Sequence, residues 1–132
     1  MNVRSWIGSK KWQTLLDGTA AVSMKRGDLV LVALKGSYGK VRPAVVIQSN
    51  HFPDHPSVVI LPFTSHLDTH ASLRVPIHPT PANGLRQLSW LMIDKPHTVD
   101  RDKIPEVIGS LASGQLAEID RALTLFLGIG DR

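Results

Sequence analysis

Polar side chains that could act on a phosphate ester stand at the ends of three apolar runs in this sequence. They are Arg42, Thr64, Ser65, Asp94 and His97. A guanidinium matches the geometry of a phosphate group and stabilises negative charge that grows in a transition state. A carboxylate or an imidazole can serve as general base or general acid. The set therefore suits metal-free phosphoryl transfer, for which RNA supplies its own nucleophile, the 2′-hydroxyl group.

Each of these residues also has an ordinary structural interpretation. A Thr–Ser pair after a strand commonly caps a turn, and the segment DKPH (94–97) is typical of a proline turn. Arg42 could equally be a solvated charge at the rim of the fold, because loops are commonly polar. Pro43 restricts Arg42 to extended geometry, so the guanidinium starts from a rigid backbone. The choice depends on whether the fold brings the strand ends together.

Short strands are the elements that would position these residues. Apolar runs rich in β-branched residues, separated by turn-forming residues, predict strands at 28–34, 43–49, 57–63, 72–78 and 87–93. In the fourth run Pro76 cannot donate to a sheet ladder, so we expect an edge strand or a bulge. Arg74 falls on the face opposite the apolar side chains of that run. Strands at this spacing predict a small antiparallel β-barrel or sandwich, in which strand ends can converge.

The C-terminal third changes to a helical period. Apolar residues recur at helical spacing, namely Leu116, Ile119, Leu123 and Phe126. They predict a helix that is capped at Ser113, stops at Gly128, and packs its apolar stripe on the barrel or on a partner chain. A shorter helical turn is expected at 102–111.

The first 23 residues differ in composition from the rest of the chain. The segment SKKWQTLLDG (9–18) could form a short helix, and we expect residues 1–23 to be an extension, poorly ordered or docked on the surface. With 132 residues in all, the chain is too short for two domains, so we expect a single domain at 24–132.

Charge and composition narrow the class of protein. The absence of cysteine excludes disulfides, thiol nucleophiles and thiolate zinc sites. A net charge of +4 favours an anionic partner such as nucleic acid. No apolar stretch is long enough to span a membrane, and the N-terminus lacks the apolar region of a signal peptide. We therefore expect a cytoplasmic protein with no membrane partner.

Two common kinds of catalytic centre are disfavoured. His51 and His55, like the pair His66 and His70, have the spacing of metal ligands on a helix. Prolines interrupt any helix around the first pair, however, and the second lies in a turn-rich segment. We therefore expect no metal site and no cofactor. A Ser–His–Asp hydrolase lacks a supporting GxSxG turn.

Several short motifs come one after another in a recognisable order. They are MKRGDLVLVAL (24–34), VRPAVVIQSN (41–50), VVILPFTS (58–65), DKPHTVD (94–100) and ALTLFLGI (122–129). In this order they resemble the MazF/PemK family of toxin endoribonucleases. The resemblance implies a mainly β fold with some α-helix, an SH3-like antiparallel β-barrel of the CcdB/PemK type with a C-terminal helix. It also implies the toxin of a type II toxin–antitoxin pair: a homodimeric mRNA interferase that cleaves single-stranded RNA sequence-specifically and is neutralised by an antitoxin protein.

The resemblance also implies roles for individual residues. The arginine of the family's RP motif falls on Arg42, which would stabilise the scissile phosphate. The family's threonine after the third strand falls on Thr64, which would position the phosphate with Ser65. The acidic residue of the family's DQPRT segment falls on Asp94, and either Asp94 or His97 would be the general base, the other the acid.

Further residues are expected to bind RNA, by charge or by base stacking. They are Tyr38, Lys40, Ser65, Arg86 and Lys95. The sequence departs from the family in its short loop KGSYGK (35–40), which has neither histidine nor acid. It also has Lys95 where the family has glutamine and His97 where the family has arginine. At Met92, some members of the family have arginine. His97 could replace the lost chemistry, because imidazole titrates near neutrality, or Arg86 or Lys40 could compensate instead.

Two other functions share this fold. One is a poison that binds gyrase, as CcdB does, and cleaves nothing; the strand-end polar set argues against it, because a protein-binding toxin needs no such groove. The other is a catalytically degenerate barrel, which the departures from the family pattern would favour.

Overall fold

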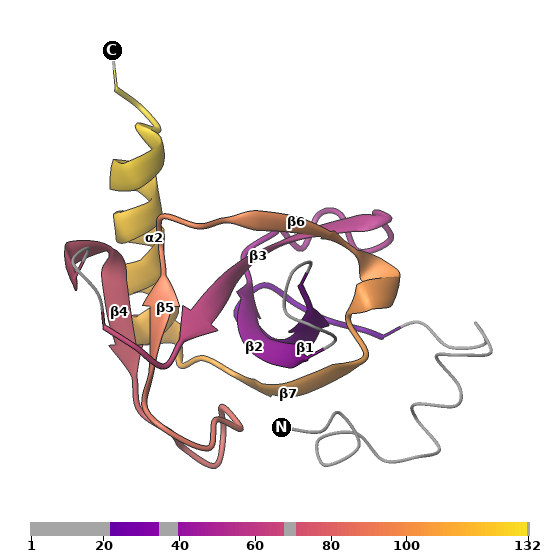
Figure 1. Ribbon diagram of the computed structural model, residues 1–132. Coiled ribbons are helices and arrows are strands. Elements are labelled where there is room, and N and C mark those ends of the chain that lie inside the picture. The colour runs from indigo at the N-terminus through magenta and orange to yellow at the C-terminus, as the bar shows by residue number, and fades with distance from the viewer. Residues whose placement is uncertain (1–21, 35–39, 68–70, 132) are drawn as a thin grey trace.

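The computed structural model describes residues 22–34, 40–67 and 71–131 (Figure 1). Its strands are β1 (Asp28–Ala33), β2 (Val41–Val46), β3 (Ser57–Thr64), β4 (Arg74–Ile77), β5 (Ser89–Met92), β6 (His97–Asp100) and β7 (Glu106–Ser110). The helix α2 spans Ser113–Leu127, and short 3₁₀ turns occupy Ala71–Leu73 and Arg101–Lys103. The helix predicted at 9–18 lies outside the described residues.

The strands form one curved antiparallel sheet in the order β4–β5–β3–β2–β1–β7. β3 is shared between two partners on one edge, because residues 57–60 pair with β6 whereas residues 63–64 pair with β5. β2 occupies the other edge of β3. The prediction of a small antiparallel β-barrel with a C-terminal helix is confirmed in the form of a half-barrel. The prediction of an edge strand around Pro76 is also confirmed, since β4 ends the sheet.

The central strands are buried on both faces, which explains their nearly continuous apolar sequences. One face packs Leu29, Val45, Leu61 and Phe63 against Ile119 and Leu123 of α2 and the apolar residues of β4 and β5. The other face packs Val30, Val32, Ala44, Val46, Val58 and Ile60 around Ile104. Figure 1 shows α2 standing beside β4 and β5, with β1 and β2 in the middle of the molecule.

The cap of α2 lies one residue before the predicted cap, Ser113, and the helix ends at Gly128 as predicted. Ala112 is the cap residue, and its N–H donates to Oε1 of Gln115 over 3.1 Å. Gly128 adopts a φ of 68° and ends the helix in the left-handed conformation. Phe126 is exposed rather than part of the buried stripe, because the outer end of α2 extends past the sheet.

The sequence-based prediction is wrong at 102–111. A 3₁₀ turn covers only Arg101–Lys103, and Glu106–Ser110 form strand β7 instead of a helical turn. Pro105 is unfavourable inside a helix, and the β-branched Val107 after it pairs with Val30 of β1. β6 was not expected either, since DKPH (94–97) was interpreted as a turn only. No helix in the described part of the chain has the length and apolar character needed to cross a membrane.

Candidate functional site

The β2–β3 ladder brings the first two predicted site residues together. Ala44 of β2 pairs with Pro62 of β3, and the two strands run antiparallel. Arg42 and Thr64 each lie two residues beyond this pair, at the same end of the two strands, and both line one cleft. β2 starts earlier than predicted because its pairing with β1 extends through Arg42. Arg42 therefore lies within a strand and not on a loop.

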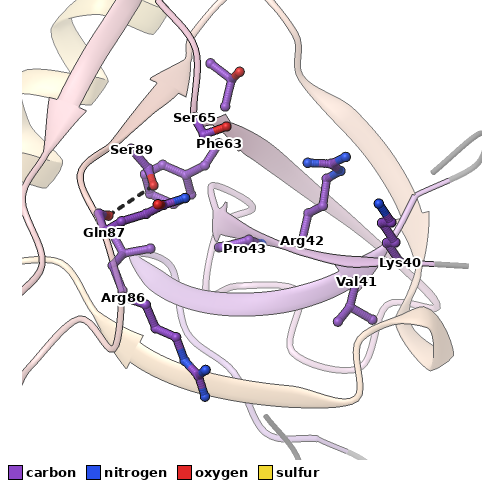
Figure 2. Close-up of a pocket in the computed structure, with 11 residues that line it drawn as sticks. Lys40, Val41, Arg42, Pro43, Phe63, Ser65, Arg86, Gln87 and Ser89 are labelled. Carbon is purple, nitrogen blue, oxygen red and sulfur yellow. Dashed lines mark hydrogen bonds between the residues drawn. The ribbon is translucent and has the colours of Figure 1, made fainter. Parts of the chain in front are cut away.

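A cleft of about 350 Å³ opens at this end of the ladder (Figure 2). Its lining includes five residues that were predicted to act on RNA, namely Lys40, Arg42, Thr64, Ser65 and Arg86. The nearly buried side chains of Phe63 and Leu85 contribute apolar lining. Strand ends that are far apart in the sequence thus converge on one concave surface, as the chemical interpretation of these residues requires.

Arg42 is the most available cation at this site. Its side chain is exposed, and within the described parts of the chain no hydrogen bond or ion pair occupies its guanidinium. Lys40 precedes it by two positions, and Figure 2 shows both side chains extending to the same side of the backbone. Arg26 and Arg74, in contrast, are engaged by Asp120 and Asp94. The cleft therefore presents positive charge to an anion such as a phosphate group.

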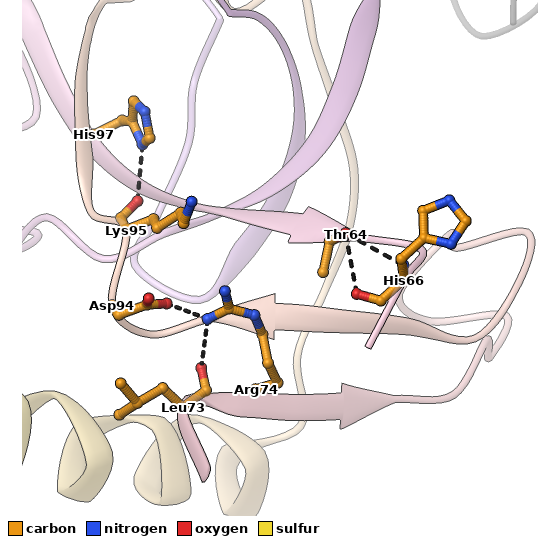
Figure 3. A network of polar contacts seen from close by, with 7 residues as sticks. All are labelled: Thr64, His66, Leu73, Arg74, Asp94, Lys95 and His97. Atoms are coloured by element: carbon orange, nitrogen blue, oxygen red, sulfur yellow. Dashed lines mark hydrogen bonds and ion pairs between the residues drawn. The ribbon is translucent and has the colours of Figure 1, made fainter. Parts of the chain in front are cut away.

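Thr64 is the last residue of β3 and is held in a short turn (Figure 3). Its Oγ1 accepts a hydrogen bond from the N–H of His66 at 3.2 Å and donates one to the carbonyl oxygen of the same residue at 3.3 Å. The adjacent Ser65 is exposed. The turn-capping interpretation of Thr64 therefore holds, and the same contacts fix its hydroxyl group at the edge of the cleft.

Asp94 does not line the cleft. It forms an ion pair with Arg74, whose side chain is fully buried, while 16% of the Asp94 side chain is exposed. Arg74 also donates to the carbonyl oxygen of Leu73 over 3.4 Å (Figure 3). The pair thus ties the start of β4 to the turn that comes after β5. Arg74 was not predicted as a functional residue, because its strand pattern indicated only a charge opposite the apolar side chains.

The remaining predicted residues are also separate from the cleft lining. His97 opens β6 and is exposed, with Nδ1 2.8 Å from the carbonyl oxygen of Lys95, which is likewise exposed. Neither lines the cleft. Tyr38 lies outside the described residues. Among the residues that the structure describes, no group of three or more His, Cys, Asp or Glu side chains is arranged to hold a metal ion.

The cleft wall opposite Arg42 comes from residues 85–89, of which only Arg86 was predicted to act on RNA. It includes Gln87 and Ser89. Asn83 holds the preceding turn, since its Oδ1 accepts the N–H groups of Thr80 and Leu85 at 3.0 Å and its Nδ2 donates to the carbonyl oxygen of His78 at 2.8 Å. The Asn-Gly pair at 83–84 signals a turn in the sequence, but not which cleft the turn supports.

Comparisons with known proteins give matches over most of the chain. Residues 25–127 match the family described as PemK-like, MazF-like toxin of type II toxin–antitoxin system. A protein of Mycolicibacterium smegmatis named probable endoribonuclease MazF is 47% identical over 108 residues, which cover 80% of this chain and 98% of that protein.

Solved structures share the fold at lower identity. A mycobacterial endoribonuclease in complex with its cognate antitoxin superimposes with a TM-score of 0.68 at 19% identity, covering 83% of this chain and all of that one. MazF in a MazE–MazF complex from Deinococcus radiodurans gives 0.66 at 21% identity, covering 83% of this chain and 99% of that one.

Proposed function

The chain belongs to the PemK-like, MazF-like family of toxins of type II toxin–antitoxin systems, and we propose that its cationic cleft is the centre at which it cleaves mRNA. It is an endoribonuclease of the MazF type, not a gyrase-directed poison. The observation that carries the proposal is the exposed Arg42 guanidinium, which lies beside Thr64 in a cleft that also contains Lys40. The family match at residues 25–127 supports a toxin domain at 24–132.

Arg42 and Lys40 would hold the scissile phosphate and stabilise the charge of the pentacovalent transition state. Ser65 would position one phosphate oxygen by donating a hydrogen bond, and Thr64 would do so by turning its hydroxyl from the carbonyl oxygen of His66 to the phosphate. Arg86 would hold a neighbouring phosphate. The RNA 2′ oxygen then bonds to phosphorus as the bond to the 5′ oxygen breaks. The products are a 2′,3′-cyclic phosphate and a 5′-hydroxyl end. Positioning and charge stabilisation are the two contributions that this cleft makes.

The proton transfers do not fall to Asp94 in this proposal. Its carboxylate is engaged by the buried Arg74, and no carboxylate or imidazole is among the described residues that line the cleft. We therefore assign Asp94 a structural role and assign the transfer of the 2′-hydroxyl proton, and of the proton that the 5′ oxygen takes up, to water at this exposed site. Lys95 and His97 could still contact RNA outside the cleft, because both are exposed.

Cleavage of a long single-stranded RNA by the purified protein in EDTA tests the proposal. The wild-type protein should produce discrete fragments with cyclic phosphate ends. Arg42→Ala should lower the cleavage rate by about 100-fold or more, the effect of removing one preorganised charge-stabilising group. Arg121→Ala, on the exposed side of α2, is the matched control and should cleave normally. Undiminished cleavage by Arg42→Ala would contradict the assignment.

The toxin is expected to bind an antitoxin and a second copy of itself in the cytoplasm. The solved relatives include toxins bound to their antitoxins, which supports a cognate antitoxin for this chain. Large apolar side chains remain exposed at the C-terminal end of α2, namely Leu125, Phe126, Leu127 and Ile129. An apolar patch of this kind commonly marks a protein interface, and we propose that a second copy covers it in a homodimer. We place the protein in the cytoplasm, where its mRNA substrate is translated.

A further inference from the structure

The cleft wall opposite Arg42 is held rigidly at both ends. Leu85 and Ser89 are buried, whereas Arg86 and Gln87 between them are exposed. The N–H of Leu85 donates to Oδ1 of Asn83 at 3.0 Å, and Oγ of Ser89 donates to the carbonyl oxygen of Gln87 at 3.2 Å. Hydrogen bonds therefore hold the backbone on both sides of the Gln87 side chain.

The side chain of Gln87 has hydrogen-bonding groups to offer a ligand. Figure 2 shows its amide pointing from this wall toward the middle of the cleft, whereas the Arg86 guanidinium beside it extends away. Within the described residues, no hydrogen bond occupies the Gln87 amide. An amide presents a donor and an acceptor side by side, which is the pattern found on the edge of a nucleobase.

The size and lining of the cleft fit a single nucleotide. Its volume of about 350 Å³ is at the lower end of the range for small-ligand sites. Phe63 and Leu85 give apolar lining against which a base can pack, and Arg42 lies on the other wall to hold the phosphate. Proteins that recognise RNA by sequence bind unstacked bases by this combination of packing and edge contacts.

We propose that Gln87 reads the base of the nucleotide whose phosphate Arg42 holds, and so sets the preferred base at one position of the cleavage site. This inference rests on the proposed endoribonuclease function. Adenine is the expected base, because its amino group donates to Oε1 of glutamine while a ring nitrogen accepts from Nε2. Arg86, one residue earlier, contributes charge and no base selection.

The test is to map the cleavage ends produced from a pool of random-sequence RNA. The wild-type protein should prefer adenine at one position by about 10-fold to 100-fold, the discrimination expected of one bidentate amide–base pair. Gln87→Leu should lose the preference at that position only. Gln87→Glu has two acceptors and no donor, so it should shift the preference toward cytosine, whose amino group donates.

Arg86→Ala is the comparison variant for this test. It should slow cleavage of all sequences alike and leave the base profile unchanged, as loss of a phosphate contact does. Thermal unfolding of each variant verifies that it is folded. If the wild-type protein cleaves and both Gln87 variants keep its base profile at every position, the inference is wrong while the proposed function stands. If the wild-type protein cleaves no RNA, the proposed function fails and the inference fails with it.

Discussion

Arg74 and Asp94 form an ion pair that joins the first residue of β4 to the turn after β5, with the Arg74 side chain fully buried. A buried charge that loses its partner is costly, because neither water nor protein then compensates it. The contact therefore gives Asp94 a structural reason to be present in the motif DKPHTVD (94–100).

Asp94→Ala should lower the free energy of unfolding by about 3 kcal/mol, because it removes the carboxylate that neutralises the buried Arg74 guanidinium. Urea denaturation measures this loss, and Asp54→Ala, on an exposed turn, is the control. The double variant Arg74→Met with Asp94→Leu should recover most of the stability. At a temperature where all of them are folded, Asp94→Asn should cleave RNA within a few-fold of the wild-type rate. A folded Asp94→Asn protein without activity would instead identify Asp94 as catalytic.

Thr64→Val should reduce the rate of RNA cleavage by about 100-fold, because it removes a hydroxyl donor from the cleft while keeping a similar side-chain shape. Thr64→Ser retains the hydroxyl and should stay within a few-fold of wild type. Both variants are compared in single-turnover cleavage of one RNA. Loss of the His66 contact should cost Thr64→Val only about 1 kcal/mol of stability. Equal rates for the valine and serine variants would show that the hydroxyl is not used.

His97→Ala should leave the rate of RNA cleavage within about three-fold of wild type, because an exposed imidazole outside the cleft lining is not placed to exchange a proton with the 2′-hydroxyl or the 5′ oxygen of RNA bound there. The pH–rate profile of the variant should match that of the wild-type protein. A loss of 10-fold or more, together with a changed pH profile, would instead make His97 the acid or base that the family resemblance implied.

The strands β1 to β5 and the helix α2 were predictable because their apolar residues recur with simple periods or form short continuous runs. The run 28–34 became β1 and the run 57–63 became β3 with shifts of only one residue, since both are buried on two faces. The segment 102–111 was mispredicted because β7 is set by its pairing with β1 and not by a local pattern. Long-range pairing of this kind leaves little trace in a single sequence.

The site was predictable only in part, for a related reason. Arg42 and Thr64 come together through the β2–β3 register, which results from two recognisable strands. Asp94 also comes after a recognisable strand, but its carboxylate is held by an ion pair with Arg74, which lies 20 positions earlier in the sequence. Gln87 was missed because its place in the cleft results from the turn that Asn83 holds. Arg86, one residue before Gln87, also lines the cleft, and it was named in advance only because its charge suits RNA.

Leu125→Glu should shift the protein from dimer to monomer in sedimentation analysis, because a carboxylate would have to be buried in the proposed apolar interface. Leu125 is 81% exposed in the single chain, so the substitution should leave the unfolding free energy of a monomer nearly unchanged. Glu118→Gln, at an exposed position nearer the start of α2, is the control and should remain dimeric. A wild-type protein that sediments as a monomer at all concentrations would contradict the proposed interface.

Gly109→Ala should both destabilise the protein and impair RNA cleavage, because β7 and the turn at 82–83 are in direct backbone contact. A Cβ at Gly109 would lie 2.4 Å from the carbonyl oxygen of Ala82 and 2.4 Å from the carbonyl carbon of Asn83. The turn must then move, at a cost of about 1–3 kcal/mol, and it carries the wall of the cleft with it. Gly114→Ala is the matched control, since a Cβ there meets nothing within 4 Å and alanine favours the helix. Urea denaturation should show a loss of stability, and single-turnover cleavage a loss of rate, for Gly109→Ala only. If fully folded Gly109→Ala cleaves RNA at the wild-type rate, the cleft wall does not depend on this backbone contact.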